Sequence, residues 1–213
     1  MSKTIFFDFN GTIIDDLELC LNILNKMLIE NGQVPVDLVK YKNIFTFPIK
    51  SYYVKAGFDF TKKSYEDLSV DFINYYQTAS FSCKLHEGVV AAFEKLHKLG
   101  HKVVVLSASH IENLKEQIEE FGITKYFDAI LGINDIYAKS KVGIGIDYIN
   151  SNNINPKDCI MIGDTLHDQE VANAMGIDVV LYDKGHQSRE ILLSNGAKVV
   201  SSFDEFIDII NGE

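Results

Sequence analysis

The sequence predicts an α/β fold, with a doubly wound parallel-sheet (Rossmann-like) core and an inserted α-helical cap domain. Two different hydrophobic patterns along the 213 residues indicate this arrangement. From Lys102 onward, short β-branched apolar runs alternate with helical patterns, as in βαβ units. Between the first apolar run and that region lies a long stretch with helical spacing and no strong strand signal. A chain of this length can bury a substantial core.

The expected strands are continuous apolar runs. Such runs suit strands that are buried on both faces of a parallel sheet. The first is Thr4-Ile5-Phe6-Phe7, and the later ones span 103–106, 129–131, 159–162, 179–181 and 199–200. Helices are expected between them, near 110–121, 141–151, 165–175, 187–194 and 203–211.

The stretch from about residue 16 to residue 81 has helical periodicity. Apolar residues recur at three- and four-residue steps, as in Leu17, Leu21, Leu24 and Leu28. We therefore expect residues 1–15 and 82–213 to form the core domain and residues 16–81 to form the cap.

Composition limits the classes of partner. The chain is 46% hydrophobic and 23% charged with a net charge of -10, which argues against nucleic acid or an anionic membrane as a partner. Three widely spaced cysteines, Cys20, Cys83 and Cys159, are expected to be free thiols. With no cleavable apolar leader and no run of about 18 apolar residues, we expect a cytoplasmic protein. The sequence does not indicate an oligomeric state.

Polar residues follow several of the expected strands. Asp8, Ser107 and Asp164 stand at strand ends, and a lysine is available from Lys139-Ser140-Lys141. Ligands of open α/β sheets bind beyond the carboxyl ends of the strands. A carboxylate can attack phosphorus, while a hydroxyl and an ammonium hold the phosphoryl oxygens. Neighbouring carboxylates need a cation, and Mg²⁺ fits best, so we expect phosphoryl transfer on a small phosphorylated substrate.

Four motifs in order resemble the haloacid dehalogenase superfamily, and within it the phosphoglycolate-phosphatase-like hydrolases. They are Asp8-Phe9-Asn10-Gly11-Thr12, Ser107 in VVVLSAS, Lys139 or Lys141, and Gly163-Asp164-Thr165-Leu166-His167-Asp168. The helical cap that this superfamily inserts between its first two motifs corresponds to residues 16–81. The resemblance covers nearly the whole chain.

The resemblance implies a role for each matching residue. Asp8 would be the nucleophile, although a carboxylate there could merely cap a turn. Asp164 and Asp168 could be charges favoured by a helix N-terminus, but the resemblance makes them metal ligands, Asp168 directly or through water. The implied Mg²⁺ ligands are Asp8, the Asn10 carbonyl, Asp164 and Asp168.

Phosphate binding is expected from Thr12, Ser107, Ala108 and a lysine. Lys141 is preferred to Lys139, because Ser140 is a plausible N-cap that would place Lys141 at the start of a helix. Ser107 is preferred to Ser109, which with Glu112 reads as a capping box.

Asn10 departs from the family pattern, which has aspartate there. That aspartate supplies a backbone carbonyl to the metal, and its side chain protonates the leaving group and later activates water. An amide keeps the first role and cannot perform the second. General acid–base assistance of about 10² to 10⁴ in rate is therefore at risk.

Three functions remain open at this point. The first is a Mg²⁺-dependent phosphatase, slowed by Asn10, and the second is a carbon–phosphorus hydrolase resembling phosphonoacetaldehyde hydrolases, with Lys50 as Schiff-base former. The third is a phospholigand-binding protein without turnover. Selectivity is expected from the cap residues Phe47, Lys50, Tyr52 and Tyr53. No chemistry is expected from His110, His167 or His186.

Overall fold

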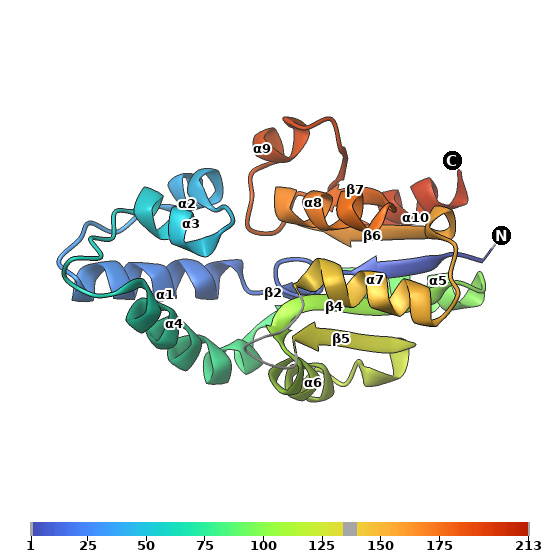
Figure 1. Ribbon diagram of the computed structural model, residues 1–213, viewed down its shortest axis with the longest axis horizontal. Helices are drawn as coiled ribbons and strands as arrows, with labels where there is room; N and C mark the ends of the chain where they lie inside the picture. Colours follow the sequence, from blue (N-terminus) through green and yellow to red (C-terminus); the bar gives the residue numbers. More distant parts are fainter. Residues whose placement is uncertain (1, 134–139, 213) are drawn as a thin grey trace.

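The computed structural model describes residues 2–133 and 140–212, and it contains a parallel sheet of six strands in the order β5-β4-β1-β6-β7-β8 (Figure 1). The strands are β1 (Thr4–Phe7), β4 (Lys102–His110), β5 (Ala129–Ile133), β6 (Cys159–Gly163), β7 (Asp178–Tyr182) and β8 (Lys198–Val200). The chain starts in the middle, adds strands on one side of β1 and then on the other. The doubly wound α/β core is thus confirmed.

The helices of the core cover both faces of this sheet. Alternate residues of β1 point to opposite faces: Ile5 and Phe7 belong to one apolar cluster and Phe6 to another. The first cluster includes residues of α5 (Val89–Lys98), α6 (Ile111–Glu120) and α10 (Phe203–Asn211). The second includes residues of α7 (Lys141–Ser151) and α8 (Leu166–Met175).

Four helices form a separate group beyond one end of the sheet (Figure 1). They are α1 (Leu17–Glu30), α2 (Leu38–Ile44), α3 (Ile49–Ala56) and α4 (Tyr65–Ala79). This group has its own buried cluster, which includes Leu24, Met27 and Tyr41. The chain leaves and re-enters the core through β2 (Ile14–Asp15) and β3 (Lys84–Leu85), which pair antiparallel. The division into two domains stays a prediction.

One local expectation was wrong. Ser109 does not begin a capping box, because it lies within β4 and its hydroxyl donates to the Asn10 side-chain carbonyl at 3.2 Å. Helix α6 instead begins after His110, whose Nδ1 accepts from the Glu112 N–H at 3.4 Å. The helix expected over 187–194 is the shorter α9 (Arg189–Leu193).

Three further expectations concern the cysteines, membrane-spanning helices and Lys139. Cys20, Cys83 and Cys159 are free thiols. Within the described parts of the chain, no helix is long and apolar enough to cross a membrane. Lys139, the alternative phosphate-binding lysine, lies outside the described residues.

Candidate active site

The carboxyl ends of the three central strands meet at one mouth of the sheet. Asp8 directly follows β1, Ser107 belongs to β4 and Asp164 directly follows β6. These residues line a cavity of about 440 Å³, together with side chains from the helical group above them. The cavity therefore lies where the core and the helices α1–α4 face each other.

Lys141 joins two of the expected carboxylates. Its Nζ donates to Asp8 Oδ1 and, at 2.7 Å, to Asp168 Oδ1, and all three side chains are buried. Burial raises the pKa of Asp8 well above its usual value, although the Lys141 charge opposes this. Burial alone would lower the pKa of Lys141, but Asp168 and Asp8 raise it above its usual value. Lys141 is thus a cation held against the expected nucleophile.

Helix α7 presents this lysine because it begins at Lys141. The Ser140 hydroxyl caps the helix by accepting from the Gly143 N–H at 3.4 Å. The N-terminus of α7, which carries Lys141, therefore faces the mouth of the sheet. The sequence predicted this position for a lysine that follows an N-cap serine.

Asp164 is held in place by its neighbours. Its Oδ2 accepts the His186 backbone N–H at 2.6 Å, and its Oδ1 accepts from the Thr12 hydroxyl at 3.3 Å. A methyl group on either Gly11 or Gly185 would overlap the Asp164 carboxylate, so the loops pack closely around it. Burial, aided by Asp168, raises the pKa of Asp164 to about 6.

Three carboxylates have the spacing of a cation site. Oxygens of Asp8, Asp164 and Asp168 lie within 4.8 Å of one another, and all three residues are buried. Asp168 also binds Lys141 and accepts from the Thr165 hydroxyl at 2.8 Å and the Thr165 N–H at 3.1 Å. Its lone pairs are therefore largely committed, which suits contact with a metal through water. An oxygen-only donor set fits Mg²⁺.

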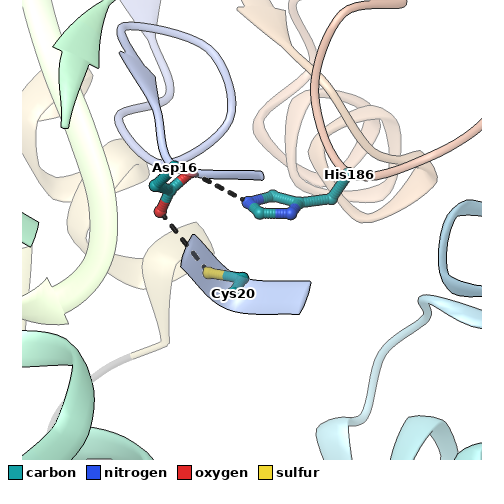
Figure 2. Close-up of side chains that lie close together, drawn as sticks. All are labelled: Asp16, Cys20 and His186. Atoms are coloured by element: carbon teal, nitrogen blue, oxygen red, sulfur yellow. Dashed lines mark hydrogen bonds and ion pairs between the residues drawn. The ribbon is translucent and has the colours of Figure 1, made fainter. Parts of the chain in front are cut away.

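Asp16 and His186 form a buried pair that the sequence analysis did not anticipate (Figure 2). Nε2 of His186 lies 3.1 Å from Asp16 Oδ1, and its Nδ1 lies 2.9 Å from the Tyr41 hydroxyl. Burial alone would lower the pKa of His186, but Asp16 raises it to about 9. Burial opposes ionisation of Asp16, but His186 together with hydrogen bonds from Tyr76 and Asn10 lowers its pKa. At neutral pH the pair is therefore ionic.

Asn10 is bound to the same carboxylate. Its Nδ2 donates to Asp16 Oδ2 at 3.1 Å and to the Tyr76 hydroxyl at 2.6 Å. The Tyr76 hydroxyl in turn donates to Asp16 Oδ2 at 2.6 Å, and the Gly11 N–H donates to Oδ1 at 2.9 Å. The amide that replaces the family's aspartate is thus a donor to a carboxylate six positions later.

The expected phosphate-binding residues do not all reach the cavity. Ser107 and Ala108 line it, whereas Thr12 is buried behind it and donates to Asp164. Lys50 is exposed, and its ammonium lies 5.6 Å from the ring centroids of Phe60 and Tyr65 rather than in the cavity lining. Lys50, expected to contact the substrate from the cap, is therefore directed toward those rings and is not among the residues that line the cavity.

The other cap residues expected to confer selectivity do line the cavity. These are Phe47, Tyr52 and Tyr53. His110 and His167, for which no chemistry was expected, also line it, and the His167 ring stacks on Phe47 with centroids 4.4 Å apart. The cavity wall that faces the carboxylates is therefore mainly aromatic.

Comparison with known proteins identifies the family. The profile described as haloacid dehalogenase-like hydrolase matches residues 5–182. The chain belongs to this family. The resemblance inferred from the four motifs is thereby confirmed, and the match covers every motif as well as the helices α1–α4.

Several relatives are similar to this chain over most of their length. A phosphoglycolate phosphatase of Mesorhizobium japonicum is 26% identical, with 96% of this chain and 93% of the relative covered. A phosphoglycolate phosphatase of Rhodobacter capsulatus is 20% identical over 100% and 98% of the two chains. A 5'-nucleotidase of Pseudomonas aeruginosa is 24% identical over 88% and 86%.

Two solved structures share the fold. The crystal structure of a predicted phosphatase from Clostridium acetobutylicum has a TM-score of 0.84 and 25% identity, with both chains fully covered. A haloacid dehalogenase-like hydrolase from Streptococcus pneumoniae has a TM-score of 0.83 and 18% identity, with 98% of each chain covered. This second likeness concerns the fold alone.

Proposed function

We propose that the protein is a Mg²⁺-dependent phosphatase that acts on a small phosphorylated metabolite through an aspartyl-phosphate intermediate. The observation that carries this proposal is the charge of the cavity. Its buried carboxylates are Asp8, Asp16, Asp164 and Asp168, and its buried cations are Lys141 and His186. Among the residues that the structure describes, four acidic groups against two cationic ones leave an excess that a divalent cation would neutralise.

Each residue of the site would have a separate role in the reaction. Asp8 forms an oxygen–phosphorus bond while the bond to the leaving oxygen breaks, and hydrolysis of the acyl phosphate then regenerates the carboxylate. Lys141 lies against Asp8 and would offer its ammonium to the phosphoryl oxygens, together with Ser107 and the backbone at Ala108. A Mg²⁺ ion held by Asp8, Asp164 and the Asn10 carbonyl, with Asp168 reaching it directly or through water, would neutralise developing charge.

Asn10 restricts the substrates that react quickly. Its side chain has no acidic proton, and it is already engaged with Asp16 and Tyr76. Leaving groups that depart as weak bases, such as acyl or aryl phosphates, hardly need a proton. Alkyl phosphates would lose the roughly 10² to 10⁴ of general acid–base assistance.

The names of the relatives support a small phosphorylated substrate, but they do not identify which one. Several are phosphoglycolate phosphatases, and one is a 5'-nucleotidase. A cavity of about 440 Å³ suits a small ligand. The position of Lys50 outside the cavity lining removes support for a Schiff-base carbon–phosphorus hydrolase. Free thiols and the acidic surface agree with a cytoplasmic location, which we propose as well.

The test measures hydrolysis of an aryl phosphate with and without Mg²⁺, for the wild-type protein and for Asp8→Asn. Turnover should require Mg²⁺, and Asp8→Asn should abolish it. Acid quenching with a labelled substrate should trap a hydroxylamine-sensitive phosphoenzyme in the wild type only. A wild-type protein that binds phosphate but neither turns over nor becomes labelled would instead be a phospholigand-binding protein.

A further inference from the structure

A second cluster in the cavity combines three kinds of metal ligand. Asp16 lies at the entrance to the helical group, Cys20 is one turn further along α1, and His186 comes from the loop after β7 (Figure 2). A carboxylate oxygen, the Cys20 sulfur and a ring nitrogen of His186 lie within 4.8 Å of one another. All three residues are buried, and all three line the cavity.

The spacing of these atoms approaches that of a tetrahedral zinc site. Zinc bonds of about 2.0 to 2.3 Å place neighbouring ligand atoms about 3.3 to 3.6 Å apart. Nε2 of His186 lies 3.1 Å from Asp16 Oδ1, and Cys20 Sγ lies 3.8 Å from Asp16 Oδ2. These two contacts use different oxygens of Asp16, so small side-chain movements would be needed to bring the three ligand atoms around one ion. The fold therefore brings one ligand atom from each of the three residues within 4.8 Å of the others.

Groups outside the cluster hold two of its members in orientation. His186 has its second nitrogen 2.9 Å from the Tyr41 hydroxyl, and its ring stacks on Phe45 with centroids 4.8 Å apart. A hydrogen-bonding partner on the second nitrogen is the usual companion of a metal-binding histidine. Asp16 is held by the Gly11 N–H and the Tyr76 hydroxyl.

We propose that Asp16, Cys20 and His186 form a binding site for a soft divalent cation of the zinc class, with the fourth coordination position open to the cavity. Three protein ligands and one open position are the arrangement of zinc sites that engage a ligand. The open position would take water or an oxygen donor of a molecule bound in the cavity. This site is distinct from the Asp8, Asp164 and Asp168 cluster.

Ligand chemistry separates the two clusters. The Asp8 cluster offers carboxylate oxygens alone, which suit Mg²⁺, whereas a thiolate and an imidazole favour zinc over magnesium. Binding would remove the proton from the Cys20 sulfur and from His186 Nε2, so the metal replaces the charge that His186 supplies to Asp16. The two cations could therefore be bound together, each at its own cluster.

The test uses untagged full-length protein, stripped of metal and kept in excess Mg²⁺ so that the oxygen-only cluster is occupied. Titration with Co²⁺, a spectroscopic substitute for zinc, should give thiolate-to-cobalt charge transfer in the near ultraviolet and the strong visible bands of a tetrahedral ion. Equilibrium dialysis should show one tightly bound Zn²⁺. Absence of the charge-transfer band in the folded wild type would overturn the proposal.

Matched cysteine variants locate the site. Cys20→Ser should remove the charge-transfer band and weaken Zn²⁺ binding by more than the about 10- to 100-fold typical of losing an outer partner. Cys159→Ser, a second buried thiol that lies in β6, should leave both unchanged. Tyr41→Phe should keep the band and weaken binding by about tenfold. Equal behaviour of Cys20→Ser and Cys159→Ser would refute the assignment.

A measurement on the wild type covers the case in which Cys20→Ser does not fold. Zinc X-ray absorption should show one sulfur scatterer at about 2.3 Å together with nitrogen or oxygen scatterers. A shell of oxygen and nitrogen alone would exclude Cys20. Because none of these readouts involves phosphate hydrolysis, failure of the metal site and failure of the proposed phosphatase activity are distinguishable.

Discussion

Replacing Asn10 by aspartate should have a cost that depends on pH. The new carboxylate would stand against Asp16 at a position where the amide now donates at 3.1 Å. Two unit charges about 4 Å apart repel by about 4 kcal/mol at an effective dielectric constant of about 20. Since one pKa unit corresponds to about 1.4 kcal/mol, the pKa of the new carboxyl should rise by about 3 units, to about 7.

The sign of the pH dependence follows from this raised pKa. The folded-state value lies above the unfolded value of about 3.9, so the folded state binds the proton more tightly. Protonation of the new carboxyl therefore stabilises the folded variant. This stabilisation is fully present below about pH 4 and is lost as the pH rises through about 7. A protonated carboxyl can still donate to Asp16, whereas an ionised one cannot.

Urea unfolding followed by circular dichroism should therefore be compared at pH 5 and pH 8. Asn10→Asp should lose about 2.5 kcal/mol more stability, relative to wild type, at pH 8 than at pH 5, because the unfolded carboxyl is already mostly ionised at pH 5. Asn10→Ala removes the donor without adding charge, so its deficit should be the same at both values. A deficit of Asn10→Asp that is equally large at pH 5 and pH 8 would show that the carboxylates do not interact as the structure indicates.

Three further changes test other contacts of the site. Lys141→Met leaves Asp8 and Asp168 unpaired and should cost about 3 to 5 kcal/mol of unfolding free energy without Mg²⁺, with part of it regained when Mg²⁺ is added; no loss in urea unfolding would contradict the pairing. Gly185→Ala pushes a methyl group into the Asp164 carboxylate and should weaken Mg²⁺ binding in calorimetry, whereas unchanged affinity would remove Asp164 from the ligands. The His186 pKa of about 9 exceeds its usual 6.5. The stabilisation of the fold by protonated His186 is therefore fully present below about pH 6.5 and is lost as the pH rises through 9. The free energy of unfolding of the wild type should fall across that window, whereas that of His186→Gln should not.

The sheet and the strand-end residues could be predicted because their signals are local. Continuous apolar runs such as Val103 to Leu106 indicate buried parallel strands, and the rule for open α/β sheets then places Asp8 and Asp164 at one mouth. Lys141 could be predicted from an N-cap serine directly before it. Each of these inferences needs only a few neighbouring residues.

The pair of Asp16 and His186 could not be predicted in this way. The two residues are separated by 170 positions, and the sequence does not show that they meet. His186 follows β7, so the same strand-end rule could have drawn attention to it. A histidine in a polar loop is usually solvated, however, so the residue type alone does not single out His186. The position of Lys50 could not be predicted for a different reason. Apolar periodicity predicts that a residue lies in a helix, but it does not show which neighbours that side of the helix faces.

The amide at position 10 and the carboxylate at position 16 are physically coupled. Asn10 donates to Asp16, and this contact helps to keep Asp16 ionised in a buried place. An aspartate at position 10 would add a fifth carboxylate to a cavity whose described lining already holds four buried carboxylates against two buried cations. The absence of the family's second aspartate is therefore more than the loss of an acid. It also leaves Asp16, the buried carboxylate that we propose as a ligand together with Cys20 and His186, without a like charge at position 10.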